Sequence, residues 1–172
     1  GNFHWPPWRG RMAVLLDLGS RLPLQIWYDP DPHISSYRFV DRLLNSLRTH
    51  DLLVFDRGLL DFEFFDRLTE QLIAFITRPH RNTAFQVEQV LHCSSTVHDQ
   101  IIRLGSSPRS SCVHLMRLVA VLHQGCWYQY LTNVLDPALL PADMVVALYR
   151  RRWRIEEAFS VVKQLLGLAY LW

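Results

Sequence analysis

The stretch Ala142–Leu166, ADMVVALYRRRWRIEEAFSVVKQLL, decides how the rest of this sequence is interpreted. Pro137 and Pro141 precede it, and Gly167 follows it. Neither proline nor glycine occurs inside the stretch, so the start and stop signals agree. The sequence therefore predicts one long, continuous helix over these residues.

Two stripes run along this predicted helix, since successive side chains turn by about 100°. One stripe is polar and collects Tyr149, Arg152, Glu156 and Lys163. The other is apolar and is predicted to face the core; it collects Leu148, Ile155, Phe159, Val162 and Leu166. A carboxylate in line with two cations and a phenol favours a metal-dependent phosphate site, with Glu156 holding the ion. The same spacing also fits an exposed helix with ordinary charge pairs.

Length and composition set the class of protein. The 172 residues are 49% hydrophobic, which is enough for one domain with a sizeable core. No apolar run of about 18 residues and no signal peptide are found, so we expect a soluble, cytoplasmic protein with no membrane partner. The net charge of +2 does not indicate nucleic acid. The clustering of Arg150, Arg151, Arg152 and Arg154 does predict contact with DNA.

The first half of the chain predicts an α/β arrangement. Met12–Leu18 and Leu22–Tyr28 flank a short turn and predict a hairpin, and Ser36–Leu47 has the period of an amphipathic helix. After these come a strand, a helix and a second strand, at Leu52–Phe55, Asp61–Leu72 and Ala74–Thr77.

Asp56 follows the first of these strands directly, and Gly58 follows Asp56. Open α/β sheets bind their ligands at the carboxyl ends of strands. Asp56 is therefore predicted to be a functional acid, and a turn or helix-capping role is the alternative.

Residues 80–136 contain mainly β-like runs and predict a β-rich insertion. Four β-like runs lie at Phe85–His92, Val97–Leu104, Val113–His123 and Cys126–Val134. Turns are predicted at Gly105–Pro108 and at Gln124-Gly125. Such an insertion would separate Asp56 from Glu156 in sequence while the fold brings the two acids together.

Several segments of the sequence resemble segments of a known protein family. Tyr149-x-x-Arg152-x-x-x-Glu156, with Lys163 seven positions later, resembles the Tyr-Arg-Glu-Lys signature of the DDE transposases of bacterial insertion sequences. The segment LLVFDRGLLDFEFFDRLTEQLIAFITR, Leu52–Arg78, is similar to the block around that family's second catalytic aspartate. The segment MAVLLDLGSRLPLQIWYD is similar to the hairpin before that block.

The resemblance covers roughly Met12–Trp172 and implies an α/β (α+β) fold. Its RNase H-like mixed sheet would have flanking helices and a β-rich insertion before the final catalytic helix. The implied core is 12–79 with 137–172, and the insertion is 80–136. Residues 1–11, which contain two prolines, would form an irregular segment.

The chemistry that the resemblance implies is cleavage and transfer of DNA strands at transposon ends. Two divalent ions, Mg²⁺ or Mn²⁺, would be held by three carboxylates, of which Asp56 is the second and Glu156 the third. The implied DNA contacts are Tyr149, Arg150, Arg151, Arg152, Trp153, Arg154 and Lys163. The implied partners are double-stranded transposon-end and target DNA and a second copy of the chain on paired ends. The protein would lie in the bacterial cytoplasm, at the nucleoid when bound to DNA.

The sequence departs from the family pattern at the first acid. In the family this aspartate lies on a strand before the hairpin that here begins at Met12, and the chain has no match to it. Asp17 is the one substitute, but its context matches the second strand, so we expect a turn residue. The chain also ends soon after the signature helix. We therefore expect a truncated copy that is inactive alone, with a non-catalytic DNA-binding remnant or an RNase H-like nuclease that cuts without joining as alternatives.

Overall fold

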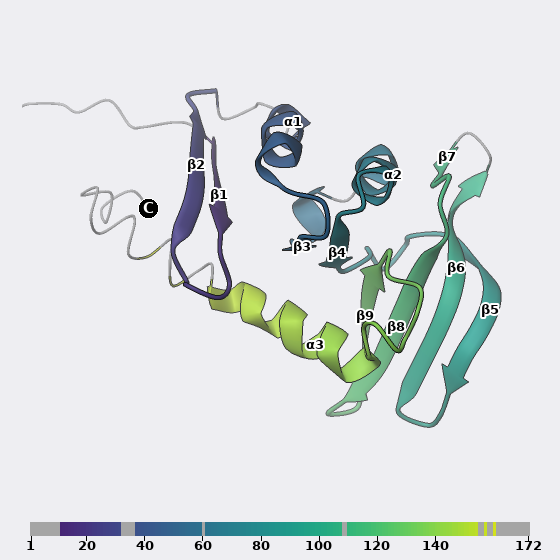
Figure 1. Cartoon of the computed structure of the whole chain (residues 1–172). Helices are drawn as coiled ribbons and strands as arrows, with labels where there is room; N and C mark the ends of the chain where they lie inside the picture. The colour runs from purple at the N-terminus through teal and green to yellow at the C-terminus, as the bar shows by residue number, and fades with distance from the viewer. Residues whose placement is uncertain are drawn as a thin grey trace, which may run out of the picture. The chain divides into compact units, whose positions relative to one another are not determined.

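The computed structural model describes residues 11–31, 37–59, 61–107, 110–154, 157 and 160 (Figure 1). The chain divides into two compact units, Gly1–Ser46 with Trp153–Trp172, and Leu47–Arg152. Each unit is described by itself below. Within the described residues, no helix is long and apolar enough to cross a membrane.

The described part of the first unit contains a hairpin and a helix. Strands β1 (Arg11–Leu16) and β2 (Pro23–Asp29) pair antiparallel, which confirms the predicted hairpin. Helix α1 (Tyr37–Ser46) confirms the predicted amphipathic helix. Its buried residues recur at the helical spacing of three and four and are Phe39, Val40, Leu43 and Leu44.

A mixed sheet forms the centre of the second unit. Seven described strands build it: β3 (Leu52–Val54), β4 (Ala74–Thr77), β5 (Phe85–Cys93), β6 (Val97–Ser107), β7 (Ser110–Ser111), β8 (Met116–His123) and β9 (Cys126–Thr132). Their order is β3-β4-β9-β8-β6-β5, with β7 paired to β6. Strands β3 and β4 are parallel, and the other described pairs are antiparallel. The predicted α/β (α+β) class with a mixed sheet is confirmed.

Helices α2 (Phe62–Glu70) and α3 (Ala142–Arg150) flank this sheet on opposite faces. On β4, Phe75 stacks on Phe65 of α2 with ring centroids 4.8 Å apart. The next residue, Ile76, packs in a cluster with Val145 and Tyr149 of α3. Because neighbouring residues of a strand point to opposite faces, the two helices cover different sides of the sheet.

The strand β3, helix α2 and strand β4 confirm the predicted strand-helix-strand unit. The hairpin β8-β9, which turns at Gln124 and Gly125, is also confirmed. Strands β5 to β9 continue the same sheet as β3 and β4. The division into a core of 12–79 with 137–172 and an insertion of 80–136 stays a prediction.

The turn predicted at Gly105–Pro108 was wrong, because β6 runs on to Ser107. A bulge between Gly105 and Ser107 lets this part of β6 pair with β7. Gly105 has a φ of 117°, and a side chain there would overlap the backbone oxygen of Ser110. Glycine therefore allows the two backbones to approach closely at this point.

The strand predicted from Val113 begins later, at Met116. The carboxylate of Asp66 on α2 accepts hydrogen bonds from the backbone N–H groups of Val113, at 2.9 Å, and His114, at 3.0 Å. These two N–H groups are engaged by the helix, so they do not join the ladder of the sheet.

The single helix predicted over Ala142–Leu166 was wrong in one respect. Helix α3 ends at Arg150, and a 3₁₀ turn, η2 (Arg151–Trp153), follows it. Arg154 returns to α-helical geometry. Most of the predicted helix beyond that residue lies outside the described residues.

Substituting Gly105 by alanine should destabilise the fold much more than substituting Gly125. Both glycines have positive φ, 117° and 76°, but an added Cβ at Gly125 meets nothing within 4 Å. We expect Gly125→Ala to cost about 1 kcal/mol, from backbone conformation alone. Gly105→Ala should cost more than about 3 kcal/mol, because it adds a steric overlap with backbone. Urea unfolding of the two variants measures the difference, and equal midpoints would contradict the close approach of β6 and β7.

Candidate functional site

Asp56 lies where the sequence predicted it, just beyond the carboxyl end of β3. The parallel register aligns Val54 with Ile76 of β4, and the Phe55 N–H donates to the Ile76 carbonyl at 3.2 Å. The hydroxyl of Thr77 donates to the Asp56 carbonyl at 3.4 Å. Asp56 and the residue after β4, Arg78, therefore leave the same edge of the sheet, as ligand-binding residues of open α/β sheets do.

The carboxylate of Asp56 is accessible, with 60% of its side chain exposed. Its Oδ1 accepts a hydrogen bond from the Gly58 N–H at 2.9 Å, which holds the turn after β3. Its Oδ2 lies 4.0 Å from the Nη1 of Arg152. Arg152 follows Asp56 by 96 positions in the sequence, so the fold brings together a predicted acid and a predicted phosphate ligand.

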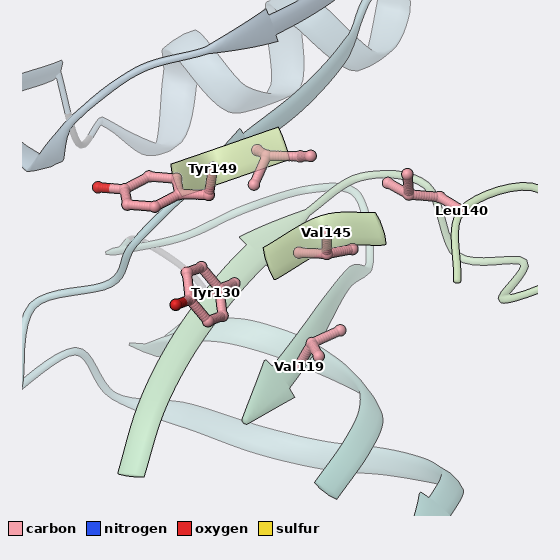
Figure 2. Close-up of a cluster of buried hydrophobic side chains, with 6 residues drawn as sticks. Val119, Tyr130, Leu140, Val145 and Tyr149 are labelled. Carbon is pink, nitrogen blue, oxygen red and sulfur yellow. The ribbon is translucent and has the colours of Figure 1, made fainter. Parts of the chain in front are cut away.

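Tyr149 is buried, although the sequence placed it on the polar stripe. Its side chain is 6% exposed, and its ring meets Tyr130 of β9 edge-on with centroids 5.3 Å apart (Figure 2). The Arg152 guanidinium lies over the same ring, 5.6 Å from its centroid. In a 3₁₀ turn, residues three apart are eclipsed, whereas an α-helix turns them about 60° apart. The η2 turn thus brings Arg152 in line with Tyr149.

Arg78 is a candidate that sequence reasoning missed. Its guanidinium lies over the rings of Tyr128, at 5.3 Å, and Tyr130, at 5.9 Å. Its Nε is buried and has no hydrogen-bond partner among the described residues. Burial raises the pKa of Tyr130, against the lowering effect of Arg78 and Arg150, so this phenol stays neutral. The available signal was the position of Arg78 directly after the predicted strand Ala74–Thr77.

Two clefts open beside Asp56, and both are lined by Arg57 and Arg81. The larger, of about 690 Å³, is lined by Arg57, Phe62, His80, Arg81, Asn82, Thr83, Ala84, Gly105, Ser106 and Ser110. The smaller, of about 340 Å³, is lined by Arg57, Arg78, Pro79, Arg81, Cys126, Trp127, Tyr128 and Gln129. None of these described lining residues is acidic, so both clefts favour an anionic ligand.

The remaining predicted contacts differ in accessibility. Arg150 and Arg151 are exposed, Trp153 is 60% exposed, and Arg154 is half-buried. Glu156 and Lys163 lie outside the described residues, so the structure places neither of them.

Asp17 has the geometry of a turn residue. It lies in the β1-β2 turn of the other unit, where its carboxylate accepts hydrogen bonds from the N–H of Ser20, at 2.8 Å, and of Gly19, at 3.4 Å. The pKa of Asp17 is lowered, first by a hydrogen bond from the Ser20 side chain and then by the two backbone bonds. These bonds account for an aspartate at this position, as the turn interpretation predicted.

The chemistry of Asp56 fits a divalent cation such as Mg²⁺, which takes hard oxygen ligands. Its carboxylate is exposed, and only its Oδ1 is engaged by the backbone. Within the described residues, no group of three acidic, histidine or cysteine side chains is close enough to hold a metal ion.

Most of the chain matches a known protein family. The family described as Transposase DDE domain matches residues 4–170. The chain belongs to this family. The transposase family acts on DNA and generally uses divalent metal ions, which agrees with the accessible carboxylate and the arginines around it.

A curated relative of the transposase family is a Sinorhizobium fredii (strain NBRC 101917 / NGR234) protein that carries the name "Putative transposase y4zB". It is 29% identical over 123 residues. The aligned region covers 67% of this chain and 34% of the relative, so the chain spans about a third of that protein's length. No solved structure matches the chain.

Replacing Ser20 by alanine should raise the pKa of Asp17 toward its ordinary value of 3.8, because the largest cause of the lowering is removed. A lowered folded-state pKa contributes stability above pH 3.8, and this contribution is lost as the pH falls through the folded pKa. Ser20→Ala should therefore be less stable than wild type near pH 6, with a difference that shrinks in acid to the part that comes from the Leu22 N–H bond to the Ser20 hydroxyl. Carbon NMR titration of Asp17 checks this, with Ser46→Ala as a control that leaves the pKa unchanged.

Proposed function

We propose that this chain carries the part of a transposase catalytic domain that holds the second and third acids, Asp56 and Glu156. The observation that supports this most is the approach of the Arg152 guanidinium to the Asp56 carboxylate. One member of the Tyr-Arg-Glu-Lys signature thereby meets the acid of a separate sequence block. The reaction is metal-dependent cleavage of a phosphodiester and strand transfer at transposon ends.

Asp56 and Glu156 would hold the metal ion, Mg²⁺ or Mn²⁺, of which an intact site takes two. When bound, such ions activate a water or a 3′-hydroxyl and stabilise the leaving oxygen. The chain's own contribution is to hold the ligands. The Gly58 N–H fixes Oδ1 of Asp56, and its Oδ2 faces Arg152 without a short hydrogen bond. A pair at 4.0 Å whose carboxylate is 60% exposed is weak, so a metal ion or a phosphate can displace it at little cost.

Double-stranded DNA is the proposed partner, both as transposon end and as target. Arg150, Arg151 and Trp153 are exposed and available to the DNA backbone, whereas Tyr149 orients Arg152 through its ring. Arg154 and Lys163 complete the proposed set. To these we add Arg57, Arg78 and Arg81, whose clefts have donors and no described acids. Two copies of the chain would act on paired ends, in the bacterial cytoplasm.

The 172 residues contain matches to two of the three expected carboxylates. We therefore expect this chain alone to bind DNA and a divalent ion but to give no strand transfer. Duplexes from the DNA that flanks its coding sequence are the appropriate substrates. Joined products with Mg²⁺ would overturn the expected inactivity, and cleavage without joining would favour a nuclease.

Replacing the proposed ligands should weaken metal binding. In the presence of duplex DNA, Asp56→Asn and Glu156→Gln should each lower Mn²⁺ affinity at least tenfold, because each removes an anionic oxygen ligand. Glu63→Gln is the matched control, since Glu63 is an exposed acid in the first turn of α2. Mn²⁺ titration by electron paramagnetic resonance measures the affinity. Equal affinity of Asp56→Asn and Glu63→Gln would exclude Asp56 as a ligand and leave a DNA-binding module.

Removing the two arginines shared by the clefts should lower the affinity for DNA and make that affinity depend less on salt concentration. If Arg57 and Arg81 each neutralise one phosphate, Arg57→Ala with Arg81→Ala should reduce the slope of log K against log salt by about 2. Arg103→Ala is the control, because Arg103 is exposed and paired with Glu88 on β5 and β6. Fluorescence anisotropy at several salt concentrations gives both slopes. A slope that falls equally in the control would place the DNA elsewhere.

A further inference from the structure

The most deeply buried charge in the described part of the chain belongs to Arg117 of β8. Its side chain is 0% exposed. Its Nε donates to Oδ1 of Asp99 at 2.7 Å, and its Nη2 donates to Oδ2 at 2.6 Å. Asp99 lies on the neighbouring strand β6, and its side chain is 5% exposed. The two form a bidentate ion pair inside the sheet layer that α3 covers.

The third nitrogen of this guanidinium donates to carbonyl groups outside the sheet. Nη1 of Arg117 donates to the carbonyl of Leu140 at 2.6 Å and to that of Val134 at 3.5 Å. Leu140 immediately precedes Pro141, the N-cap of α3. Proline has no side-chain group that could cap the helix. The segment that enters α3 is therefore held by a side chain from the sheet.

Stability alone is a poor reason for this arrangement. A buried ion pair loses solvation on folding, and apolar residues of similar volume are often as stabilising. Apolar contacts, however, are not directional. Val145 and Tyr149 attach α3 to the sheet through such contacts, against Val119 and Tyr130 (Figure 2). Such contacts alone do not define the position of the helix along the sheet, whereas the hydrogen bond to the Leu140 carbonyl fixes its start.

We propose that Arg117, oriented by Asp99, is a positioning residue that fixes the start of α3 and thereby the place of Arg152 opposite Asp56. The importance of that placement rests on the proposed function. The inference that Arg117 fixes the start of α3 does not rest on the proposed function, because it concerns α3 alone. Helix α3 connects the two points directly, since it begins after Leu140 and leads into the turn that carries Arg152. A shift of about 1 Å at a catalytic group can cost about 100-fold in rate.

The test separates positioning from stability. Asp99→Leu with Arg117→Met replaces the ion pair by apolar residues and removes the bonds to the Leu140 and Val134 carbonyls. Glu88→Gln with Arg103→Met is the matched control, because it removes an exposed ion pair between β5 and β6. Hydrogen exchange of backbone amides is followed for α3 and, in the same sample, for β8 and β9.

We expect the α3 amides of the Asp99→Leu, Arg117→Met variant to exchange at least tenfold faster than in wild type. The β8 and β9 amides should keep their protection, and the control variant should change neither. Unchanged α3 exchange would overturn the proposal. An equal acceleration of α3, β8 and β9 would also overturn it, because it would show a general structural role.

Arg117→Lys is the second variant. It tests the proposal in the case that the double variant does not fold. Lysine keeps the charge opposite Asp99, but it lacks the planar fork that serves a carboxylate and a carbonyl together. The same acceleration confined to α3 supports the proposal. Exchange in α3 that matches wild type overturns it.

Measurements of DNA affinity test whether Arg117 acts on the site through Arg152. Arg152→Ala should weaken binding less in the Asp99→Leu, Arg117→Met background than in the wild-type background, because α3 no longer holds Arg152 in place. Equal losses in both backgrounds would overturn the link to Arg152. If the wild-type chain binds no DNA, the proposed function fails, whereas the exchange measurement still decides whether Arg117 positions α3.

Discussion

The parallel pairing of β3 with β4 is the constraint on which the site depends. Parallel strands end at the same edge of a sheet, so this pairing places Asp56 and Arg78 side by side. It requires the connecting helix α2, whose N-cap Asp61 accepts a hydrogen bond from the Phe64 N–H. The aromatic rings of α2 and β4 then bury that helix on one face of the sheet. The opposite face is left for α3.

Helix α3 brings the second half of the site to this edge. Its buried residues, Val145 and Tyr149, are four apart and therefore share one face of the helix. Beyond Arg150 the chain tightens into a 3₁₀ turn, and Arg152 comes to lie between the Tyr149 ring and the Asp56 carboxylate. A residue that sequence assigned to the polar stripe is thus mainly a packing residue, and its packing orients its charged neighbour.

The arginines proposed to bind DNA have two origins in the sequence. Arg150, Arg151, Arg152 and Arg154 are adjacent and were evident as a cluster. Arg57 follows β3, whereas Arg78 and Arg81 follow β4, so they form no single cluster in the sequence. They meet because β3 and β4 end together. The buried pair of Arg117 and Asp99 was equally hidden, since β-strand sequences give no indication of which polar residues will meet across a sheet.

The sequence by itself determined the family and the elements of the mixed sheet, and it predicted Asp56 as an acid and Arg152 as a phosphate contact. These follow from local signals: strand and helix periods, turn residues and a signature of fixed spacing. The tertiary structure decided the burial of Tyr149, the end of α3 at Arg150, the late start of β8 and the gathering of the scattered arginines. Each of these depends on contacts between residues distant in sequence, such as Asp66 with Val113 and Tyr149 with Tyr130, and local periodicity contains no information about them.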